Sequence, residues 1–258
     1  EMKADNSVVC FETFVGKIYL YKNETFITQE FNKGIYWDID VLLKIQNYID
    51  PEKNIIEIGA HCGTSSLFYA KLLKNKSKLY AYEPQTNLFD LLVKNINENN
   101  LNKKIKSYNK AMFCAKGFFN MNNIDIDGGG GEVYKRYNEE SELPCNFGGI
   151  GLGLKGEKVK TITLDNCNKK NVGFIHCDAQ GAENFIFSSG KKLLKKNKPV
   201  ILYENNKKYN PKLYDNVMQS YPKYFVEGSF NLEEYCLNVL NYSRVIHNFN
   251  TGDDLLIP

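Results

Sequence analysis

Short apolar runs and amphipathic stretches alternate through the first half of the chain. Residues 54–59, 78–82 and 105–110 are apolar runs of strand length, and residues 65–73 and 88–99 between them have the apolar spacing of helices. Strands that alternate with helices over short connections are typical of parallel crossover units. The pattern therefore predicts an α/β fold with a doubly wound, mostly parallel sheet.

The same alternation returns in the second half of the chain. Residues 174–177 and 199–203 are apolar runs of strand length, and residues 182–196 between them predict a helix. Two further runs, residues 224–230 and 245–249, are rich in aromatic and β-branched side chains. We expect these two runs to form the last strands.

The first fifty residues have a different pattern. Residues 10–27 are rich in aromatic and β-branched side chains and are interrupted by Gly16, which predicts a small antiparallel lead-in. Trp37 then begins a stretch of helical spacing that reaches residue 48, and it is predicted equally well as a core residue or as a lid. We expect residues 1–50 to form a lead-in and lid, and residues 51–258 to form the main domain.

The pattern fails between residues 118 and 158. Glycines occupy positions 128–131, and more follow between 148 and 153. Long segments without periodicity in compact domains are often functional loops. We therefore predict that residues 118–158 form a mobile loop on the substrate side of the sheet.

The composition agrees with one folded domain and narrows the class of partner. Of 258 residues, 43% are hydrophobic and 24% are charged, which is enough apolar material for a core. The net charge is only +3, and 31 Lys stand against two Arg, Arg136 and Arg244. Because bidentate recognition of phosphate and guanine depends on Arg, this balance argues against nucleic acid as the partner.

The cysteines argue for a reducing compartment. The seven Cys are scattered and include no Cys-x-x-Cys pair, so no zinc framework is visible and no metal ligand is assigned. The chain has neither a signal segment nor an apolar run long enough to span a membrane. We expect free thiols, a cytoplasmic location and no membrane insertion.

The clearest chemical signal lies where the first central strand ends. Residues 57–63 read Glu-Ile-Gly-Ala-His-Cys-Gly and lead directly into a predicted helix. Gly59 and Gly63 allow a sharp turn and a close approach to a ligand, and the free amides of the helix attract an anion. Glu83 ends the next strand, where a carboxylate can accept hydrogen bonds from both hydroxyls of a ribose.

The glycine spacing restricts which nucleotide fits. It differs from the Gly-x-Gly-x-x-Gly of dinucleotide sites, and the chain has no Gly-Lys-Ser/Thr of a phosphate-binding loop. A nucleoside with one charged tail fits better than a pyrophosphate cofactor. S-adenosyl-L-methionine has this structure.

Several segments together resemble the FkbM family of S-adenosylmethionine-dependent methyltransferases, with similarity from about residue 50 to 205. The segments that carry the resemblance are residues 55–63, 81–84, 95–101, 177–183 and 198–204. Residues 146–149 are also similar to versions from large DNA viruses, which would place the protein in the host cytoplasm. The chain departs from the family pattern Asp-Val-Glu-Gly-x-Glu at Ala179 and Gln180.

The resemblance implies a class I Rossmann-like methyltransferase and assigns roles to individual residues. Members of the family mostly methylate hydroxyls of sugars, glycans and natural products, so a small-molecule or glycan acceptor is implied. Glu83 would hold the ribose, and Asp178 would face the transferred methyl group. The other residues implied in cofactor binding are Glu57, Gly59, Ala60, Gly63, Thr64 and Ser65 in the turn, Pro84 beside Glu83, and Ala111 and Met112 near the adenine.

Methyl transfer to an alcohol makes a nearby base useful, because the hydroxyl proton must leave. Asp178 is the first candidate, and His176 and Glu204 are the second. For His176, a buried, hydrogen-bonded role is favoured over that of a base, because the residue alternates with Ile175 and Cys177 on a short predicted strand. If a divalent cation assists, Asp178 and Glu204 offer hard oxygen ligands.

Two other functions remain open. Methylation of an RNA ribose would require Lys17, Lys160 or Lys198 to gather around Asp178. A protein that binds a nucleoside or glycan without catalysis would explain the loss of a carboxylate at Gln180. The sequence assigns neither the acceptor nor the oligomeric state.

Overall fold

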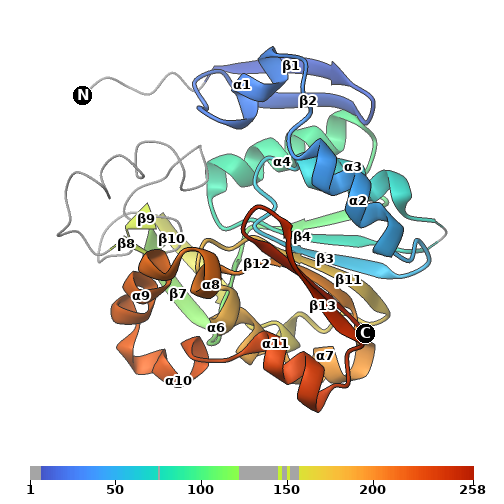
Figure 1. The fold of residues 1–258 in the computed structure, drawn as a ribbon. Helices are drawn as coiled ribbons and strands as arrows, with labels where there is room; N and C mark the ends of the chain where they lie inside the picture. The colour runs from blue at the N-terminus through green and yellow to red at the C-terminus, as the bar shows by residue number, and fades with distance from the viewer. Residues whose placement is uncertain (1–6, 75, 122–144, 147–149, 152–156) are drawn as a thin grey trace.

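The centre of the molecule is a twisted sheet with helices on both faces (Figure 1). The computed structural model describes residues 7–74, 76–121, 145–146, 150–151 and 157–258. Within these residues the sheet has seven strands in the order β13-β14-β12-β11-β3-β4-β5. Their bounds are β3 (Asn54–Ile58), β4 (Leu79–Tyr82), β5 (Ile105–Tyr108), β11 (Val172–Cys177), β12 (Val200–Glu204), β13 (Arg244–Asn250) and β14 (Asp253–Ile257).

The pairing confirms the predicted doubly wound, mostly parallel sheet. The strands β5, β4, β3, β11 and β12 are parallel to their neighbours in this group, whereas β14 is antiparallel to β12 and to β13. The strand predicted at residues 245–249 is confirmed as β13, and its partner β14 was not predicted. In β3, Ile55 and Ile56 are fully buried on opposite faces, which explains why a central strand reads as a continuous apolar run.

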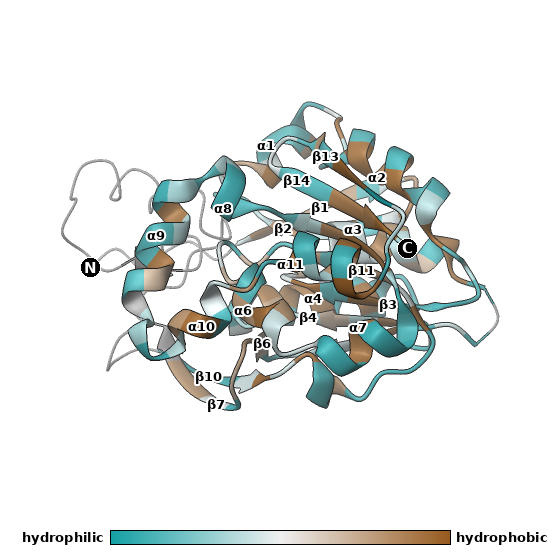
Figure 2. Cartoon of the chain, turned by 60° about the horizontal axis from the view of Figure 1, so that its bottom comes forward, coloured by the Kyte–Doolittle hydropathy of each residue, from teal (hydrophilic) through white to brown (hydrophobic). Residues whose placement is uncertain are grey.

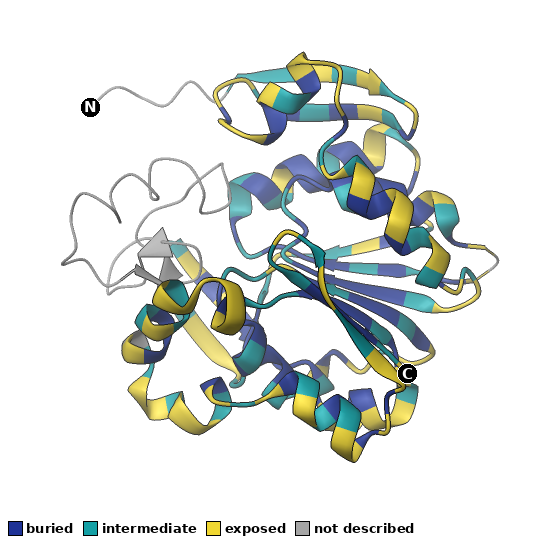
Figure 3. Ribbon diagram, viewed as in Figure 1, coloured by how far each residue is buried: buried dark blue, intermediate teal, exposed yellow. Residues whose placement is uncertain are grey.

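Two hydrophobic cores lie on the two faces of the sheet. Ile55 packs in one core with Leu67 and Leu92, and Ile56 packs in the other with Ile186 and Leu194. The helices are hydrophilic on much of their outer surface (Figure 2), and buried residues concentrate in the strands that they cover (Figure 3). The first core is covered by α2 (Ile39–Ile45), α3 (Thr64–Leu72) and α4 (Thr86–Glu98), and the second by α6 (Glu183–Ser188), α7 (Lys191–Asn197) and α11 (Leu232–Glu234).

The lead-in packs on the first core. As predicted, β1 (Val8–Thr13) and β2 (Gly16–Tyr21) form an antiparallel pair, and α1 (Ile27–Asn32) follows. Ile18 is fully buried in the same core as Ile55. The Asn95 side chain in α4 accepts a hydrogen bond from Tyr19 N at 2.7 Å and donates one to Tyr19 O at 3.0 Å. The division at residue 50 stays a prediction.

The prediction of a strand at residues 224–230 is wrong. This segment is helical, with a 3₁₀ turn η3 (Pro222–Tyr224) followed by α10 (Phe225–Gly228). Proline is favoured at the first position of a helical turn. Phe225 is 62% exposed and Val226 is 80% exposed, so these two apolar side chains, which suggested a strand, are not core residues.

The helix predicted at residues 182–196 is two helices. They are separated at Ser189 and Gly190, where the Ser189 hydroxyl donates to the carbonyl of Ile186 at 2.6 Å. A Cβ at Gly190 would lie 2.4 Å from Leu164 Cδ2, so the break lets this turn pack closely. The helix predicted at residues 37–48 is α2 followed by η1 (Gln46–Tyr48).

The loop prediction for residues 118–158 is wrong at both ends of the segment. Among the described residues, β6 (Ala111–Met112), β10 (Glu157–Ile162) and β7 (Gly117–Met121) form a three-stranded sheet, and β10 and β7 are antiparallel. A short pair, β8 (Cys145–Asn146) and β9 (Ile150–Gly151), lies between them in the sequence. Residues 122–144, 147–149 and 152–156 of this prediction lie outside the described residues.

The remaining helices are short and lie between the strands of the second half. They are η2 (Asp165–Cys167), α8 (Asn206–Tyr209), α9 (Pro211–Ser220) and the π-helical turn η4 (Tyr235–Val239). In the part of the chain that the structure describes, no helix is long and apolar enough to cross a membrane.

Candidate functional site

The glycine turn after β3 brings two strand ends together. Gly59 has a φ of +83°, and a Cβ at this position would lie 1.8 Å from the carbonyl oxygen of Asp178 at the end of β11. The Asp178 amide donates a hydrogen bond to the Ile58 carbonyl at 3.0 Å. Only glycine permits this approach, because the backbone of the neighbouring strand fills the space of a side chain.

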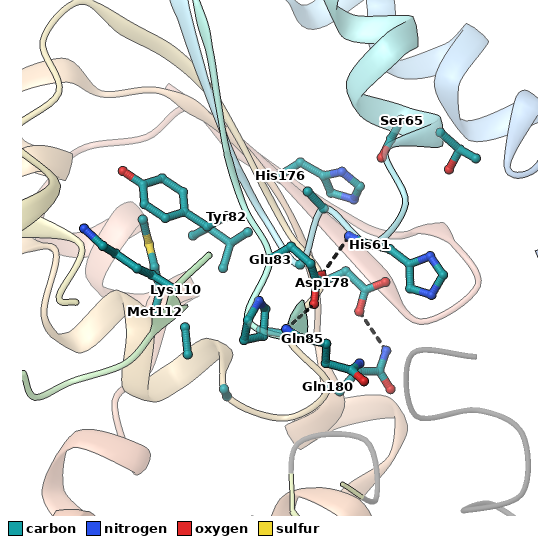
Figure 4. Close-up of a pocket in the computed structure, with 18 of the residues that line it drawn as sticks. His61, Ser65, Tyr82, Glu83, Gln85, Lys110, Met112, His176, Asp178 and Gln180 are labelled. Carbon is teal, nitrogen blue, oxygen red and sulfur yellow. Dashed lines mark hydrogen bonds between the residues drawn. The ribbon is translucent and has the colours of Figure 1, made fainter. Parts of the chain in front are cut away.

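A pocket of about 410 Å³ opens at this carboxyl edge of the sheet (Figure 4). Its volume lies in the range of small-molecule sites. Among the predicted site residues, those that line it are Gly59, Ala60, Thr64, Ser65, Glu83, Pro84, Ala111, Met112, His176 and Asp178. Glu57, Gly63 and Glu204 are not part of its wall, and the roles assigned to all these residues stay predictions.

Glu83 lies at one side of the pocket with both carboxylate oxygens engaged. His61 N donates to Oε2 and Gln85 N donates to Oε1, each at 2.8 Å (Figure 4). Each oxygen keeps a second lone pair that can accept a further hydrogen bond. Burial raises the pKa of Glu83 to about 7 despite these two amide donors. The carboxylate is therefore held rigidly in an orientation that suits a pair of vicinal hydroxyls.

Glu57 lies behind the pocket wall rather than on it. Its carboxylate accepts hydrogen bonds from the hydroxyls of Ser65, at 2.5 Å, and Ser66. Burial raises the pKa of Glu57 to about 7. Ser65 reaches the pocket in its place, so Glu57 acts on the site through the first turn of α3.

His176, in β11, lies beside the buried Glu57 carboxylate. Its Nδ1 lies 3.2 Å from the Tyr69 hydroxyl and 3.9 Å from Glu57 Oε1. Burial lowers the pKa of His176, which favours the neutral imidazole. The hydrogen-bonded interpretation of His176 is therefore supported, although the ring also lines the pocket.

The opposite side of the pocket is apolar and aromatic. Tyr82 stacks on Tyr108 with a centroid distance of 4.8 Å, and Met112 and Phe113 are buried beside it. Lys110 lies at the rim next to Ala111. This surface suits the flat face of an adenine, because apolar and aromatic groups can pack against it.

The third side of the pocket is acidic. The carboxylates of Asp38, Asp178 and Asp253 line it, and Asp178 is exposed. Burial and the charge of Asp178 raise the pKa of Asp253 to about 7. Burial and the same charge raise the pKa of Glu204 well above its usual range.

The amide of Gln180 joins Asp178 to Glu204. Gln180 Nε2 lies 2.7 Å from Asp178 Oδ1 (Figure 4). The same nitrogen lies 3.3 Å from Glu204 Oε2. Asn206 Nδ2 donates to the same Glu204 oxygen at 2.8 Å. Side-chain amides thus occupy the space between these carboxylates in which a shared cation would lie, so this pair does not fit the divalent cation considered from the sequence.

A separate cluster of Glu233, His247 and Asp254 lies outside the pocket, with one potential ligand atom from each within 4.8 Å of the others. His247 Nδ1 lies 3.2 Å from Asp254, whereas Nε2 lies 3.6 Å from Glu233, so the two nitrogens face different carboxylates. Asp254 also accepts hydrogen bonds from Asn205, Tyr209 and the Asn248 amide. The cluster therefore links β13 to β14 by hydrogen bonds and brings Glu233 of α11 close to His247.

Sequence reasoning missed several lining residues. The main ones are Asp38, Gln85, Lys110, Phe119 and Asp253. Asp253 follows Gly252 in a turn between two apolar runs, which is a hairpin signal that could have identified β14. Trp37 lines the pocket and also packs against the first core, and its role as a lid stays a prediction.

The strand order of the sheet, with antiparallel β14 between β12 and β13, is that of the class I methyltransferases, which bind S-adenosylmethionine at the carboxyl edge. A family model described as "Methyltransferase FkbM domain" matches residues 57–230. The chain belongs to this family and is an S-adenosylmethionine-dependent methyltransferase. The pocket fits this cofactor, because a rigid carboxylate, an apolar wall and an exposed acid surround one cavity.

Comparison with solved structures finds similar folds at low identity. The methyltransferase FkbM from Methylobacillus flagellatus is 12% identical with a TM-score of 0.49, over 81% of this chain and 44% of that chain. The present chain thus spans less than half of that protein. An O-methyltransferase from Bacillus cereus, solved in complex with SAH, is 15% identical with a TM-score of 0.40, over 85% of this chain and 79% of that chain. No curated protein matches the sequence.

Proposed function

We propose that the protein transfers the methyl group of S-adenosylmethionine to a hydroxyl of an uncharged small molecule, such as a sugar or glycan. The observation that carries this proposal is the exposed Asp178 carboxylate at the end of β11, inside the pocket. Its Oδ1 accepts a hydrogen bond from Gln180. Among the described residues, no donor bonds to Oδ2, so this oxygen is available to an acceptor.

Asp178 acts as the base in this mechanism. S-adenosylmethionine, when bound, supplies a methyl group that its sulfonium makes electrophilic. The carboxylate of Asp178 takes the hydroxyl proton while the acceptor oxygen bonds to the methyl carbon. The carbon–sulfur electron pair would stay on sulfur, so the cofactor would leave as S-adenosylhomocysteine. Glu83 holds the ribose, and the apolar wall around Met112 holds the adenine, so that the reacting atoms are aligned.

The charge of the pocket favours an uncharged acceptor over RNA. The side near Asp178 carries the carboxylates of Asp38 and Asp253. The RNA hypothesis needs a relay from Lys17, Lys160 or Lys198, and none of the three lines the pocket. A phosphate backbone at this side would be repelled by the charge of Asp178 and would meet none of these three lysines.

The test is methyl transfer from labelled S-adenosylmethionine to a panel of monosaccharides, oligosaccharides and capped RNA. We expect label in a saccharide, and a loss of roughly 10²- to 10⁴-fold in kcat for Asp178→Asn with cofactor affinity retained in calorimetry. Transfer to RNA alone would reverse the choice of acceptor. If Asp178→Asn kept full turnover, Asp178 would not be the base, and a wild type that binds the cofactor without any turnover would indicate a binding protein.

We also propose that the reaction needs no divalent cation. The support is the position of Gln180 Nε2, which bonds to both carboxylates that could have held one. Activity should therefore survive exhaustive treatment with EDTA. A loss that magnesium restores would contradict this part of the proposal.

A cytoplasmic location remains part of the proposal. It is supported by the free thiols of Cys10, Cys62, Cys114, Cys167, Cys177 and Cys236. The relation to large DNA viruses stays a prediction, because residues 147–149 of the segment that carries it lie outside the described residues.

A further inference from the structure

We propose that Gln180 is a positioning residue for methyl transfer, which holds the Asp178 carboxylate so that Oδ2 faces the acceptor. This inference rests on the proposed role of Asp178 as the base. Gln180 lines the pocket. The inference is carried by the position of its side-chain amide, which lies between the carboxylates of Asp178 and Glu204 at the ends of two neighbouring strands.

The backbone around Gln180 is fixed in an unusual conformation. Gln180 and Gly181 have φ angles of +52° and +97°, so two successive residues are left-handed. Such a conformation costs energy for glutamine and persists when its surroundings hold it. Glu183 Oε1 accepts hydrogen bonds from Ala179 N at 2.9 Å and Gly181 N at 3.3 Å, which fixes the turn on both sides of Gln180.

The side chain of Gln180 then reaches back to the strand ends. Its Nε2 carries two hydrogens, and Asp178 Oδ1 and Glu204 Oε2 lie at 2.7 Å and 3.3 Å. Glu204 also accepts a hydrogen bond from Asn206. Among the described residues, the hydrogen-bond donor to the Asp178 carboxylate is Gln180. Without Gln180, the Asp178 side chain would be free to rotate.

An amide is suited to this position because it donates hydrogen bonds without carrying charge. A lysine would neutralise Asp178 and weaken it as a base. A glutamate would have no donor when ionised and would bring a further negative charge beside Asp178. In this chain the amide both orients Asp178 and leaves its charge in place.

The test compares Gln180→Glu, which keeps the shape and removes the donors, with Gln180→Ala. Asn168→Ala is the matched control, because Asn168 is also left-handed, with a φ of +52°, but is exposed and lies outside the pocket. We expect kcat to fall roughly 10- to 100-fold in both Gln180 variants, as for a misplaced catalytic group. The Kd for S-adenosylhomocysteine and the acceptor KM should stay within about twofold of the wild type, and Asn168→Ala should keep the wild-type kcat.

Crystal structures of the wild type and Gln180→Glu provide a second readout that needs no acceptor. Asp178 Oδ1 should contact residue 180 in the wild type and should turn away in the variant. The proposal would be overturned by an unchanged kcat in Gln180→Glu or by an unchanged Asp178 orientation. A loss of cofactor affinity as large as the loss of kcat would overturn it as well. If the wild type methylates no hydroxyl compound, the proposed function fails, while the Asp178 orientation still decides the role of Gln180.

Discussion

The two sides of the pocket hold their carboxylates in different ways. On the cofactor side, Glu57 and Glu83 are buried and accept hydrogen bonds from hydroxyls or backbone amides of the adjoining turns. On the transfer side, Asp178 is exposed, and a side-chain amide holds it together with Glu204. The carboxylates of the first side are therefore held by several donors within buried turns, whereas Asp178 on the other side is held by one side-chain amide that a single substitution can remove.

This difference follows from what each side must do. In the proposed function, the ribose and methionine parts of the cofactor are the same in every turnover, so a rigid partner such as Glu83 would lower the entropy cost of binding. A base must be reachable by the acceptor and must exchange a proton, which agrees with the exposure of Asp178, the proposed base. Substitutions on the cofactor side should therefore change stability and affinity, and those on the transfer side should change turnover.

The largest effect is expected where the two sides meet, at Gly59. In Gly59→Ala the Cβ would lie 1.8 Å from the Asp178 carbonyl oxygen, and the φ of +83° would be strained as well. We expect a loss of more than about 3 kcal/mol in the free energy of unfolding, measured by urea denaturation. Gly34→Ala is the control, since Gly34 also has a positive φ but no atom within 4 Å of its Cβ position, and its loss should be about 1 kcal/mol. Equal losses in the two variants would show that the strand ends can move apart.

A smaller effect is expected from Glu57, which makes the free energy of unfolding depend on pH. Burial raises the pKa of Glu57 from 4.5 to about 7, so between these values the folded protein keeps a proton that the unfolded chain has released. Stability due to this group therefore falls as the pH rises from about 5 to 7, by up to about 3 kcal/mol. Relative to the wild type, Glu57→Gln should become more stable at pH 8 than at pH 5 in urea denaturation. Glu12 is exposed, so Glu12→Gln should change the free energy of unfolding by the same amount at pH 5 and at pH 8. If Glu57→Gln also changed it by the same amount at both pH values, the prediction would be contradicted.

Glu83→Gln should separate affinity from turnover. An amide at this position places one N–H group against a backbone N–H, because both carboxylate oxygens now accept amide bonds. We expect the Kd for S-adenosylhomocysteine to rise roughly 10- to 100-fold in calorimetry, as for the loss of a charged hydrogen-bond acceptor. Glu98→Gln, at the surface beside Tyr19, serves as the control and should bind normally. An unchanged Kd for S-adenosylhomocysteine in Glu83→Gln would show that Glu83 does not bind the cofactor.

The smallest effect is a signal from Trp37, the single tryptophan of the chain. Because Trp37 lines the pocket beside Asp38, its fluorescence should change when S-adenosylhomocysteine is titrated, with the Kd found by calorimetry. Trp37→Phe should abolish the signal and change the Kd by only about threefold, a fraction of the energy of a full aromatic contact. A titration without any change in emission would place the bound cofactor away from Trp37.

The parts of the site that the sequence predicted are those at the ends of parallel strands. Glu83 and Asp178 could be placed in one site because apolar runs identify β4 and β11, and the carboxyl ends of parallel strands share one edge. Asp38 and Asp253 could not be found in this way. Asp38 precedes a short helix in the lead-in, and Asp253 comes from the antiparallel β14 near the end of the chain. Their approach to Asp178 depends on how these distant segments pack.

By itself, the sequence determined the alternation of the central parallel strands with their helices, the glycine turn after β3 and the acidic residue that ends β4. These features are local, because apolar periodicity and glycine conformations act within a few residues. Only the tertiary structure decided that Glu57 lies behind the wall, that Asp253 joins the pocket and that Gln180 bonds to two carboxylates at once. Such contacts depend on burial and on distances between strands far apart in the chain, and neither is encoded in any short segment.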